Sequence, residues 1–208
     1  MQCEVGHKDV IHDWFARLPE LQNGSMTRII AGRLGGRRLR VPGEGTRPTS
    51  DRVRESVFNI LAARSDLEGV WVLDLYAGSG ALGLEAISRG AAGATFVDSG
   101  RRAVTTIAAN IKACGVSSIT TVHTRSVSAY LAGAPERRFG LVFSDPPYDL
   151  AADRVAEDLS LLTARLADDA LVVLERSTRS PADAWPSEYE VVVDKSYGDT
   201  RVEIARLV

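Results

Sequence analysis

The sequence predicts an α/β fold, with a mostly parallel seven-stranded sheet covered by helices on both faces. Five apolar, strand-like runs between residues 70 and 174 alternate with segments of helical length. This alternation is typical of parallel strands that are joined by helices crossing the sheet. Two more strand-like runs, at 189–195 and 201–208, are separated only by a short turn. They predict a closing hairpin, which gives the sheet an antiparallel member.

The expected elements follow one another in regular order. Strands are predicted at 70–75, 94–97, 119–122, 139–143 and 170–174, and helices at roughly 80–89, 100–114, 126–132 and 151–167. Ahead of them, Ser50 is in position to cap a helix over residues 51–64. The apolar side of that helix is predicted to consist of Val53, Val57, Phe58, Ile60 and Leu61.

A basic segment precedes the α/β region. Residues 27–41 alternate apolar and basic residues around Gly35-Gly36, which predicts an N-terminal β-hairpin appendage. From Thr27 to Arg54 there are eight arginines and two acidic residues, a net charge of +6 in a chain whose total is −2. A basic arm on an acidic body predicts a polyanionic partner that meets one face of the protein.

The chain is expected to divide into three parts. Residues 1–25 are predicted to be a leader without function, because Gly24-Ser25-Met26 resembles a cloning junction before an initiator methionine. Residues 26–48 form the basic arm, and residues 49–208 form the main domain. We expect a cytoplasmic monomer without a metal, since there is no signal peptide or membrane-length apolar run and no metal-ligand spacing among the two cysteines and three histidines.

A glycine-rich turn follows the first strand of the α/β region. Gly78, Gly80 and Gly83 fit the dinucleotide-binding pattern G-x-G-x-x-G, and Asp98 lies 20 residues after Gly78. A nicotinamide-dependent oxidoreductase is therefore one alternative. However, Asp74 stands at the end of the strand, where its carboxylate would repel a diphosphate and attract an ammonium or sulfonium group.

These charges favour S-adenosylmethionine as the cofactor, because it carries two cationic groups and no phosphate. Asp98 could accept hydrogen bonds from its ribose hydroxyls, and the glycines allow the backbone to approach it closely. Ser126 is a candidate for the adenine edge, although it could instead be a helix cap. The predicted cofactor residues are Thr49, Asp74, Tyr76, Ala77, Gly78, Ser79, Gly80, Asp98 and Ser126.

The tetrapeptide Asp145-Pro146-Pro147-Tyr148 follows the fourth strand. Two prolines restrict the backbone, so Asp145 and the Pro146 carbonyl could accept hydrogen bonds from one amino group in a fixed geometry. Tyr148 offers a flat face for an unstacked base. A simpler interpretation is that Asp-Pro-Pro only ends a strand, but the glycine turn upstream favours a catalytic role for Asp145, Pro146, Pro147 and Tyr148.

These motifs resemble those of a known family. The segment from Asp74 to Ala86 looks like motif I of the Rossmann-like class I S-adenosylmethionine-dependent methyltransferases, and residues 145–148 look like their amino-methylating motif IV. With the stretches at 29–33 and 47–55, the chain is similar to the RsmD family, bacterial enzymes that methylate N2 of a guanine in 16S rRNA. One departure is Tyr76, where the family often has phenylalanine, a change that should be harmless if its hydroxyl reaches water.

The resemblance implies an RNA substrate, either 16S rRNA or an assembly intermediate of the small ribosomal subunit. It also implies that Thr49 and Arg52 approach the cofactor's carboxylate. RNA contacts are predicted from the arginines of the basic segment, namely Arg28, Arg33, Arg37, Arg38, Arg40, Arg47 and Arg52.

Other nucleic-acid functions stay open at this point. A DNA adenine-N6 methyltransferase uses the same tetrapeptide, but only 60 residues follow Tyr148, which leaves little room for a separate target-recognition region. Cytosine-C5 methylation is disfavoured because neither cysteine follows a proline. A binding module without catalysis would not need the three acids Asp74, Asp98 and Asp145 at the ends of three strands.

Overall fold

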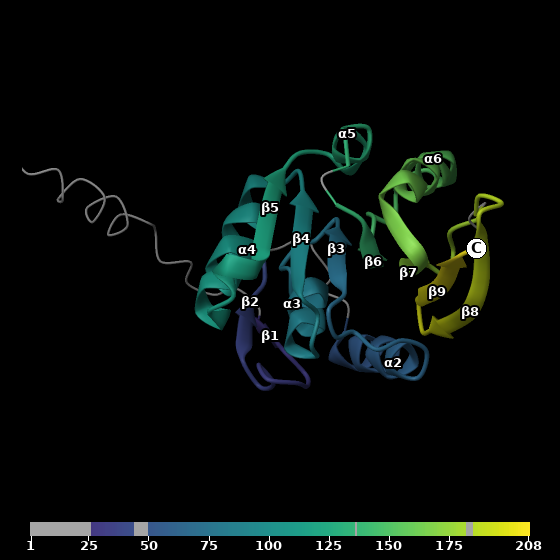
Figure 1. Cartoon of the computed structure of the whole chain (residues 1–208). Helices are drawn as coiled ribbons and strands as arrows, with labels where there is room; N and C mark the ends of the chain where they lie inside the picture. The colour runs from purple at the N-terminus through teal and green to yellow at the C-terminus, as the bar shows by residue number, and fades with distance from the viewer. Residues whose placement is uncertain (1–25, 44–49, 136, 182–184) are drawn as a thin grey trace, which may run out of the picture.

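The computed structural model describes residues 26–43, 50–135, 137–181 and 185–208. Its centre is a seven-stranded sheet with the strand order β5-β4-β3-β6-β7-β9-β8 (Figure 1). The strands are β3 (Trp71–Leu75), β4 (Gly93–Asp98), β5 (Thr120–Thr124), β6 (Phe139–Ser144), β7 (Leu166–Ser177), β8 (Tyr189–Tyr197) and β9 (Thr200–Leu207). Strands β3 to β7 pair in parallel, and β9 lies antiparallel between β7 and β8. The predicted mostly parallel sheet with an antiparallel member is confirmed.

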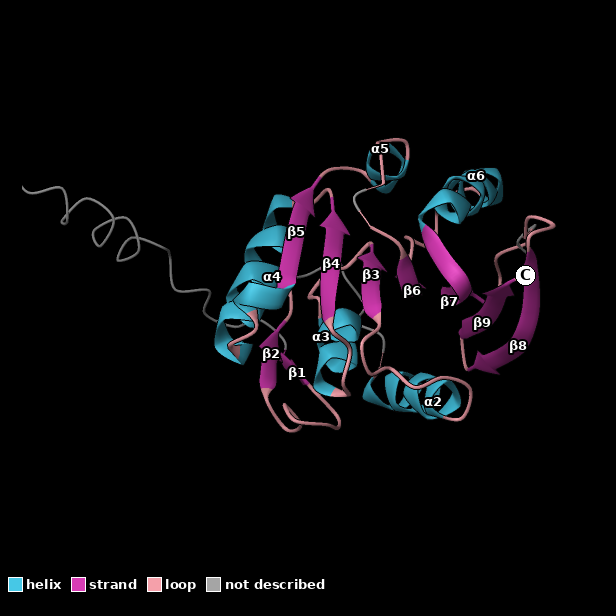
Figure 2. Cartoon of the chain, in the orientation of Figure 1, coloured by secondary structure: helices cyan, strands magenta, loops and turns pink. Residues whose placement is uncertain are grey.

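Helices cover both faces of this sheet (Figure 2). They are α2 (Asp51–Ala62), α3 (Ala81–Ser88), α4 (Arg101–Cys114), α5 (Val127–Leu131) and α6 (Ala152–Leu162), with 3-10 turns at Ser117–Ile119 and Thr163–Arg165. Helices α2, α3 and α4 share one apolar core with the sheet, and α5 and α6 share another. Because side chains alternate along a strand, Val72 packs in the first core and Leu73 and Leu75 in the second. Asp74 consequently faces α3.

The helix predicted after residue 50 is present and ends slightly earlier than expected. Ser50 caps it by accepting a hydrogen bond from the Val53 N–H at 3.3 Å. The buried side includes the predicted Val53, Val57, Phe58 and Leu61, while Ile60 is only partly buried. Its fifth buried member is Arg54, a charged side chain that apolar periodicity did not predict.

The N-terminal segment forms the expected antiparallel hairpin, with strands β1 (Met26–Arg28) and β2 (Arg38–Arg40). These strands are much shorter than the predicted 27–41, because the loop between them bonds to α3 instead. The Ile30 and Ala31 N–H groups donate to the Glu85 carboxylate at 2.6 and 3.1 Å, and the Leu34 N–H donates to the Ser88 hydroxyl at 2.9 Å. The hairpin is therefore docked on the sheet-covering helices, with Ile29, Leu34 and Leu39 in their core.

The largest difference from the predicted boundaries concerns α6 and β7. The helix stops at Leu162, and β7 begins at Leu166 and runs for 12 residues. Pairing with β9 extends β7 as far as Ser177, opposite Thr200.

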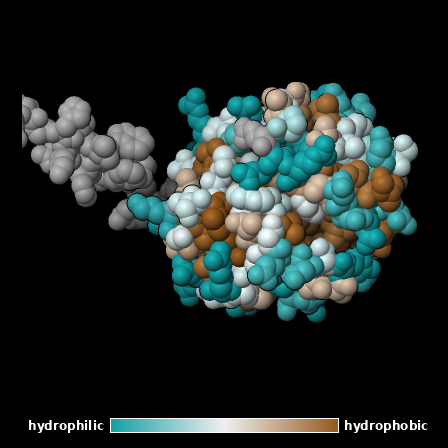
Figure 3. All heavy atoms as spheres, viewed as in Figure 1, coloured by the Kyte–Doolittle hydropathy of each residue, from teal (hydrophilic) through white to brown (hydrophobic). Residues whose placement is uncertain are grey.

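On the face seen in Figure 3, apolar residues lie between polar ones in small groups. None of the described helices combines the length and apolar character that crossing a bilayer would require.

Candidate functional site

A cavity of about 890 Å³ lies at the carboxyl ends of β3, β4, β5 and β6. Parallel strands bring the loops that follow them to one edge of the sheet, so motifs far apart in sequence meet there. Of the predicted site residues, the cavity wall contains Asp74, Tyr76, Ala77, Gly78, Ser79, Asp98, Ser126, Asp145, Pro146, Pro147 and Tyr148. Gly80 does not line it. Gly80 has φ 76° and is the N-cap residue of α3 instead.

The glycine turn is tight and open toward the cavity. Tyr76 and Gly78 have positive φ angles of 54° and 56°, and the Gly80 N–H donates to the Ala77 carbonyl at 2.7 Å. A methyl group at Gly78 would meet only the Tyr76 carbonyl oxygen, at 3.9 Å. At Gly83, by contrast, it would come within 2.5 Å of the Phe96 ring. Gly83 thus allows α3 to pack on β4, while Gly78 leaves room for a ligand.

Asp74 is a buried carboxylate at the end of β3 that bonds to the backbone of α3. Its Oδ2 accepts a hydrogen bond from the Gly83 N–H in the first turn of α3, at 2.9 Å. Burial raises the pKa of Asp74 to about 8, a rise opposed by this bond and assisted by repulsion from Asp98. A cation in the cavity would supply the charge compensation that the carboxylate lacks.

Asp98, the last residue of β4, bonds to the glycine turn. One of its oxygens accepts the Gly78 N–H at 2.9 Å, and the other accepts the Gly100 N–H at 2.8 Å. Both bonds leave acceptor capacity on the oxygens, since a carboxylate has about four lone-pair positions. The group is half-buried, so vicinal hydroxyls of a ligand could reach it from the cavity.

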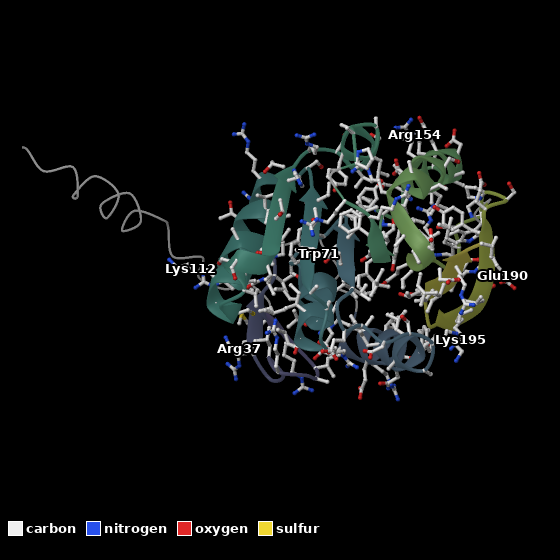
Figure 4. The ribbon with its side chains drawn as sticks, viewed as in Figure 1. Arg37, Trp71, Lys112, Arg154, Glu190 and Lys195 are labelled. Atoms are coloured by element: carbon white, nitrogen blue, oxygen red, sulfur yellow. The ribbon has the colours of Figure 1, made fainter. Side chains whose placement is uncertain are left out.

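The hydroxyl of Tyr76 has a protein partner. It donates to Oδ2 of Asp158 on α6 at 2.7 Å. Burial raises the pKa of Asp158, and Tyr76 and Arg154 oppose that rise. Arg154 lies on the exposed side of α6, at the top of Figure 4, and also lines the cavity. Tyrosine at position 76 thus fixes the cavity wall to α6, a role that phenylalanine could not perform.

The Asp-Pro-Pro-Tyr segment leaves β6 next to the glycine turn, because β6 pairs in parallel with β3. Asp145 is partly buried, Pro146 is buried, and Pro147 is exposed. The Tyr148 side chain is 40% exposed, which is unusual for a large aromatic residue. Its ring is thus available to a planar partner at the mouth of the cavity.

Ser126, which the sequence left as either a ligand contact or a helix cap, caps a helix and also lines the cavity. Its hydroxyl accepts the Ala129 N–H at 3.2 Å and so caps α5, and the residue also lines the cavity. The cap uses only part of the hydrogen-bonding capacity of a hydroxyl. Helix capping and contact with a ligand are therefore compatible.

Arg54 is the residue of this site that sequence reasoning missed. It lines the cavity with its side chain 1% exposed. Its Nη2 donates to the Thr27 hydroxyl, the Arg28 carbonyl and Asp51 at 3.0, 2.7 and 2.8 Å. The available signal was an arginine within an apolar helix face, three residues after an acid.

The predicted Arg52 is exposed and absent from the cavity wall, and Thr49 and Arg47 lie outside the described residues.

The arginines of the hairpin are exposed on its outer surface. Arg28 is directly opposite Arg38 in the β1–β2 register, and Arg40 is opposite Met26. Arg28 pairs with the Asp51 carboxylate at 3.3 Å, which offsets the repulsion that like charges across a strand pair would otherwise cause. Arg33 and Arg37 donate to the Ile87 and Ala113 carbonyls at 3.4 and 2.9 Å, which fixes the hairpin to α3 and α4. Arg37 lies beside Lys112 at the end of α4 (Figure 4).

Comparison with known proteins identifies the family. Residues 27–206 match the family model described as Conserved hypothetical protein 95. The chain is 36% identical to ribosomal RNA small subunit methyltransferase D of Escherichia coli (strain K12) over 185 residues, covering 86% of this chain and 89% of the relative. The chain belongs to the RsmD family. A Haemophilus influenzae protein of the same name is 32% identical over 82% of this chain and 89% of its own length.

Solved structures agree with membership of the RsmD family. A candidate methyltransferase of Escherichia coli, yhhF, matches with a TM-score of 0.76 and 34% identity over 88% of this chain and 98% of its own. Magnesium protoporphyrin IX methyltransferase from Synechocystis, a structure with bound S-adenosylmethionine, matches with a TM-score of 0.60 over 76% of this chain and 79% of its own. At 13% identity the latter shows only a shared fold. The fold is that of the class I methyltransferases.

Proposed function

We propose that this protein is an enzyme that transfers a methyl group from S-adenosylmethionine to the exocyclic N2 amino group of a guanine in 16S ribosomal RNA. One observation carries the proposal: the Asp145–Tyr148 segment opens onto the same cavity as Asp74 and Asp98. Membership of a family whose relatives are named ribosomal RNA small subunit methyltransferases supports the RNA substrate. It also weighs against a nicotinamide-dependent oxidoreductase.

The cavity fits this cofactor in charge and in space. Two carboxylates, Asp74 and Asp98, face an open glycine turn, an arrangement that disfavours a diphosphate. Asp74 would compensate the positive charge, Asp98 would accept the ribose hydroxyls, and Ser126 would face the adenine side. S-adenosylmethionine supplies an electrophilic methyl group on its sulfonium sulfur. Arg54, with a buried guanidinium at the cavity wall, is a better candidate for the cofactor's carboxylate than the exposed Arg52.

The amino group of guanine is a poor nucleophile, because its lone pair is delocalised into the ring. Asp145 and the Pro146 carbonyl would accept hydrogen bonds from its two protons, which orients the nitrogen and favours a pyramidal geometry. Asp145 need not be a strong base, since the amine proton becomes acidic only after the methyl group has been attached. Tyr148 would stack on the base after it leaves its helix or loop. Positioning and electrostatics account for most of the proposed acceleration.

Replacement of Asp145 tests this mechanism. We expect Asp145→Ala to reduce single-turnover methylation by at least about a hundredfold, the scale of a lost positioning and charge-stabilising group. The affinity for S-adenosylmethionine, measured by calorimetry, should stay within about twofold. Nucleoside analysis of 16S RNA incubated with labelled cofactor separates N2-methylguanine, N6-methyladenine and 5-methylcytosine. A product other than N2-methylguanine would contradict the proposed target, and normal turnover by the variant would contradict the mechanism.

The hairpin is proposed to hold the RNA backbone through its arginines. Replacing Arg38 and Arg40 with glutamine should weaken RNA binding. It should also make the fall of log affinity with log salt less steep, by about 1.5 units of slope, since each phosphate contact contributes roughly 0.7–0.9. Lys195→Gln is a matched control, because Lys195 is exposed on β8 at the opposite edge of the sheet (Figure 4). An unchanged affinity and salt slope in the double variant would remove the hairpin from the RNA interface.

A further inference from the structure

The turn between β8 and β9 contacts helix α2 on one side and Tyr148 of the cavity wall on the other. It consists of residues 197–200, and Gly198 takes the left-handed conformation that the turn requires, with φ 62°. On one side, the Tyr197 hydroxyl is 2.7 Å from the Ser56 hydroxyl of α2. On the other side, the Thr200 hydroxyl is 3.3 Å from the Tyr148 hydroxyl. None of these turn residues lines the cavity itself.

Strand pairing and backbone hydrogen bonds hold the turn in place. Thr200 is the first residue of β9, which pairs with β7 and β8 on its two sides, opposite Ser177 and Tyr197. The Asp199 carbonyl also accepts the Thr178 N–H at 2.9 Å. Because β9 lies inside the sheet, the Thr200 hydroxyl is attached to a part of the protein with little freedom to move.

Tyr148 is in the opposite situation. It lies on a loop and is 40% exposed, so packing alone does not restrict its ring. An aromatic ring that must meet a base in one orientation loses side-chain entropy on binding, unless its rotamer is set beforehand. The hydrogen bond to Thr200 is a means of setting it.

We propose that Thr200 is a positioning residue for the target base, acting through the hydroxyl of Tyr148. The Thr200 hydroxyl holds the ring of Tyr148 in the orientation in which it receives the base. Tyr197 holds the same turn against α2 through Ser56, two residues after Arg54, which lines the cavity. This inference rests on the proposed function, because it assigns a partner to the residue on which the base is thought to stack.

The two hydroxyls can be removed separately. Thr200→Val keeps the shape and the strand preference of the side chain and removes only its hydroxyl, and Tyr148→Phe removes the other partner while leaving β9 intact. We expect each variant to lower kcat/KM for 16S RNA by about three- to tenfold, the effect of one partly exposed hydrogen bond. Thr200→Ser should restore the activity, and cofactor affinity should not change in any of these variants.

The double variant provides the decisive measurement. If the two hydroxyls act as one unit, Thr200→Val combined with Tyr148→Phe should be no slower than the slower single variant. Multiplying effects, or a Thr200→Val enzyme with wild-type kcat/KM, would overturn the proposal. A loss of folding by Thr200→Val does not obscure the result, because Tyr148→Phe breaks the same bond without changing β9, and wild-type kcat/KM in that variant would overturn the proposal.

A second threonine–tyrosine pair supplies the control. Thr163 donates to the Tyr189 hydroxyl at 3.2 Å, at the C-terminal end of α6, and neither residue lines the cavity. Thr163→Val should lower the melting temperature without changing kcat/KM. Failure of the proposed function would look different: wild-type protein would then leave 16S RNA unmethylated. If wild-type protein is active and Asp145→Ala is not, a neutral Thr200→Val refutes only the positioning role.

Discussion

The buried carboxylate of Asp74 predicts a pH dependence of cofactor binding. With a pKa of about 8, the side chain is mostly protonated in the cofactor-free protein at neutral pH. Such a group is ionised in about 1% of molecules at pH 6 and about half at pH 8. A cationic ligand selects the ionised form, so its affinity should rise close to tenfold per pH unit from about pH 5.5 to about pH 7.5.

Calorimetric titration with S-adenosylmethionine over this pH range measures the effect. The ligand's own ammonium group keeps its proton over most of the range, because α-amino groups titrate near pH 8. Asp74→Asn preserves an oxygen for the Gly83 N–H and removes the titration, so its affinity should be lower and nearly independent of pH. The Asp98 carboxylate is present in both proteins and cancels from the comparison. Equal pH slopes in wild type and variant would refute the assignment of Asp74 to the cation.

The same carboxylate affects stability, with a definite sign. An unfolded aspartate ionises near pH 4, so between about pH 4 and pH 8 the folded protein holds a proton that the unfolded chain has lost. The free energy of unfolding of the cofactor-free protein should therefore fall as the pH rises, by up to about 1.4 kcal/mol per unit from this group. Relative to wild type, Asp74→Asn should gain stability between pH 5 and pH 9 in urea unfolding. A difference that does not change with pH would contradict a raised pKa.

Two further substitutions test the packing around the cavity. Gly83→Ala would place a methyl group 2.5 Å from Cε1 of Phe96 and 3.1 Å from Asp74, so we expect a loss of about 1–3 kcal/mol in urea unfolding. Gly43→Ala, where the added methyl group has no atom of the described residues within 4 Å, should be close to neutral, and equal losses would contradict the packing argument. Tyr76→Phe removes the hydroxyl that bonds to Asp158, whose other oxygen is already buried without a partner, and should cost about 1–3 kcal/mol. A Tyr76→Phe protein as stable as wild type would show that Asp158 finds another donor.

Much of the site was predictable because its residues have local signatures. The glycine turn, the strand-end acids Asp74 and Asp98, and the proline-restricted Asp145 segment each belong to a short stretch of sequence. The parallel arrangement of the strands then places the ends of these stretches at one edge of the sheet. The strand–helix alternation that implies this arrangement is also visible along the chain.

Other features depend on partners that are distant in sequence. The hairpin strands are short because Glu85, 54 or 55 residues away, accepts two backbone N–H groups that a longer ladder would have used. Arg54 is buried because the hairpin supplies Thr27 and the Arg28 carbonyl to its guanidinium. An apolar periodicity assigns a charged side chain to the surface, since burial without partners would be too costly.

What the sequence by itself determined is thus the order of the strands and helices along the chain and the chemistry at the ends of the strands, because periodicity, glycines and prolines act over a few residues. Only the tertiary structure decided which hydroxyl meets Tyr148, which acid binds the Tyr76 hydroxyl, and which arginine is buried at the cavity wall. The reason is physical: hydrogen bonds have short range and strict geometry, so their partners are known only when the backbone is in place.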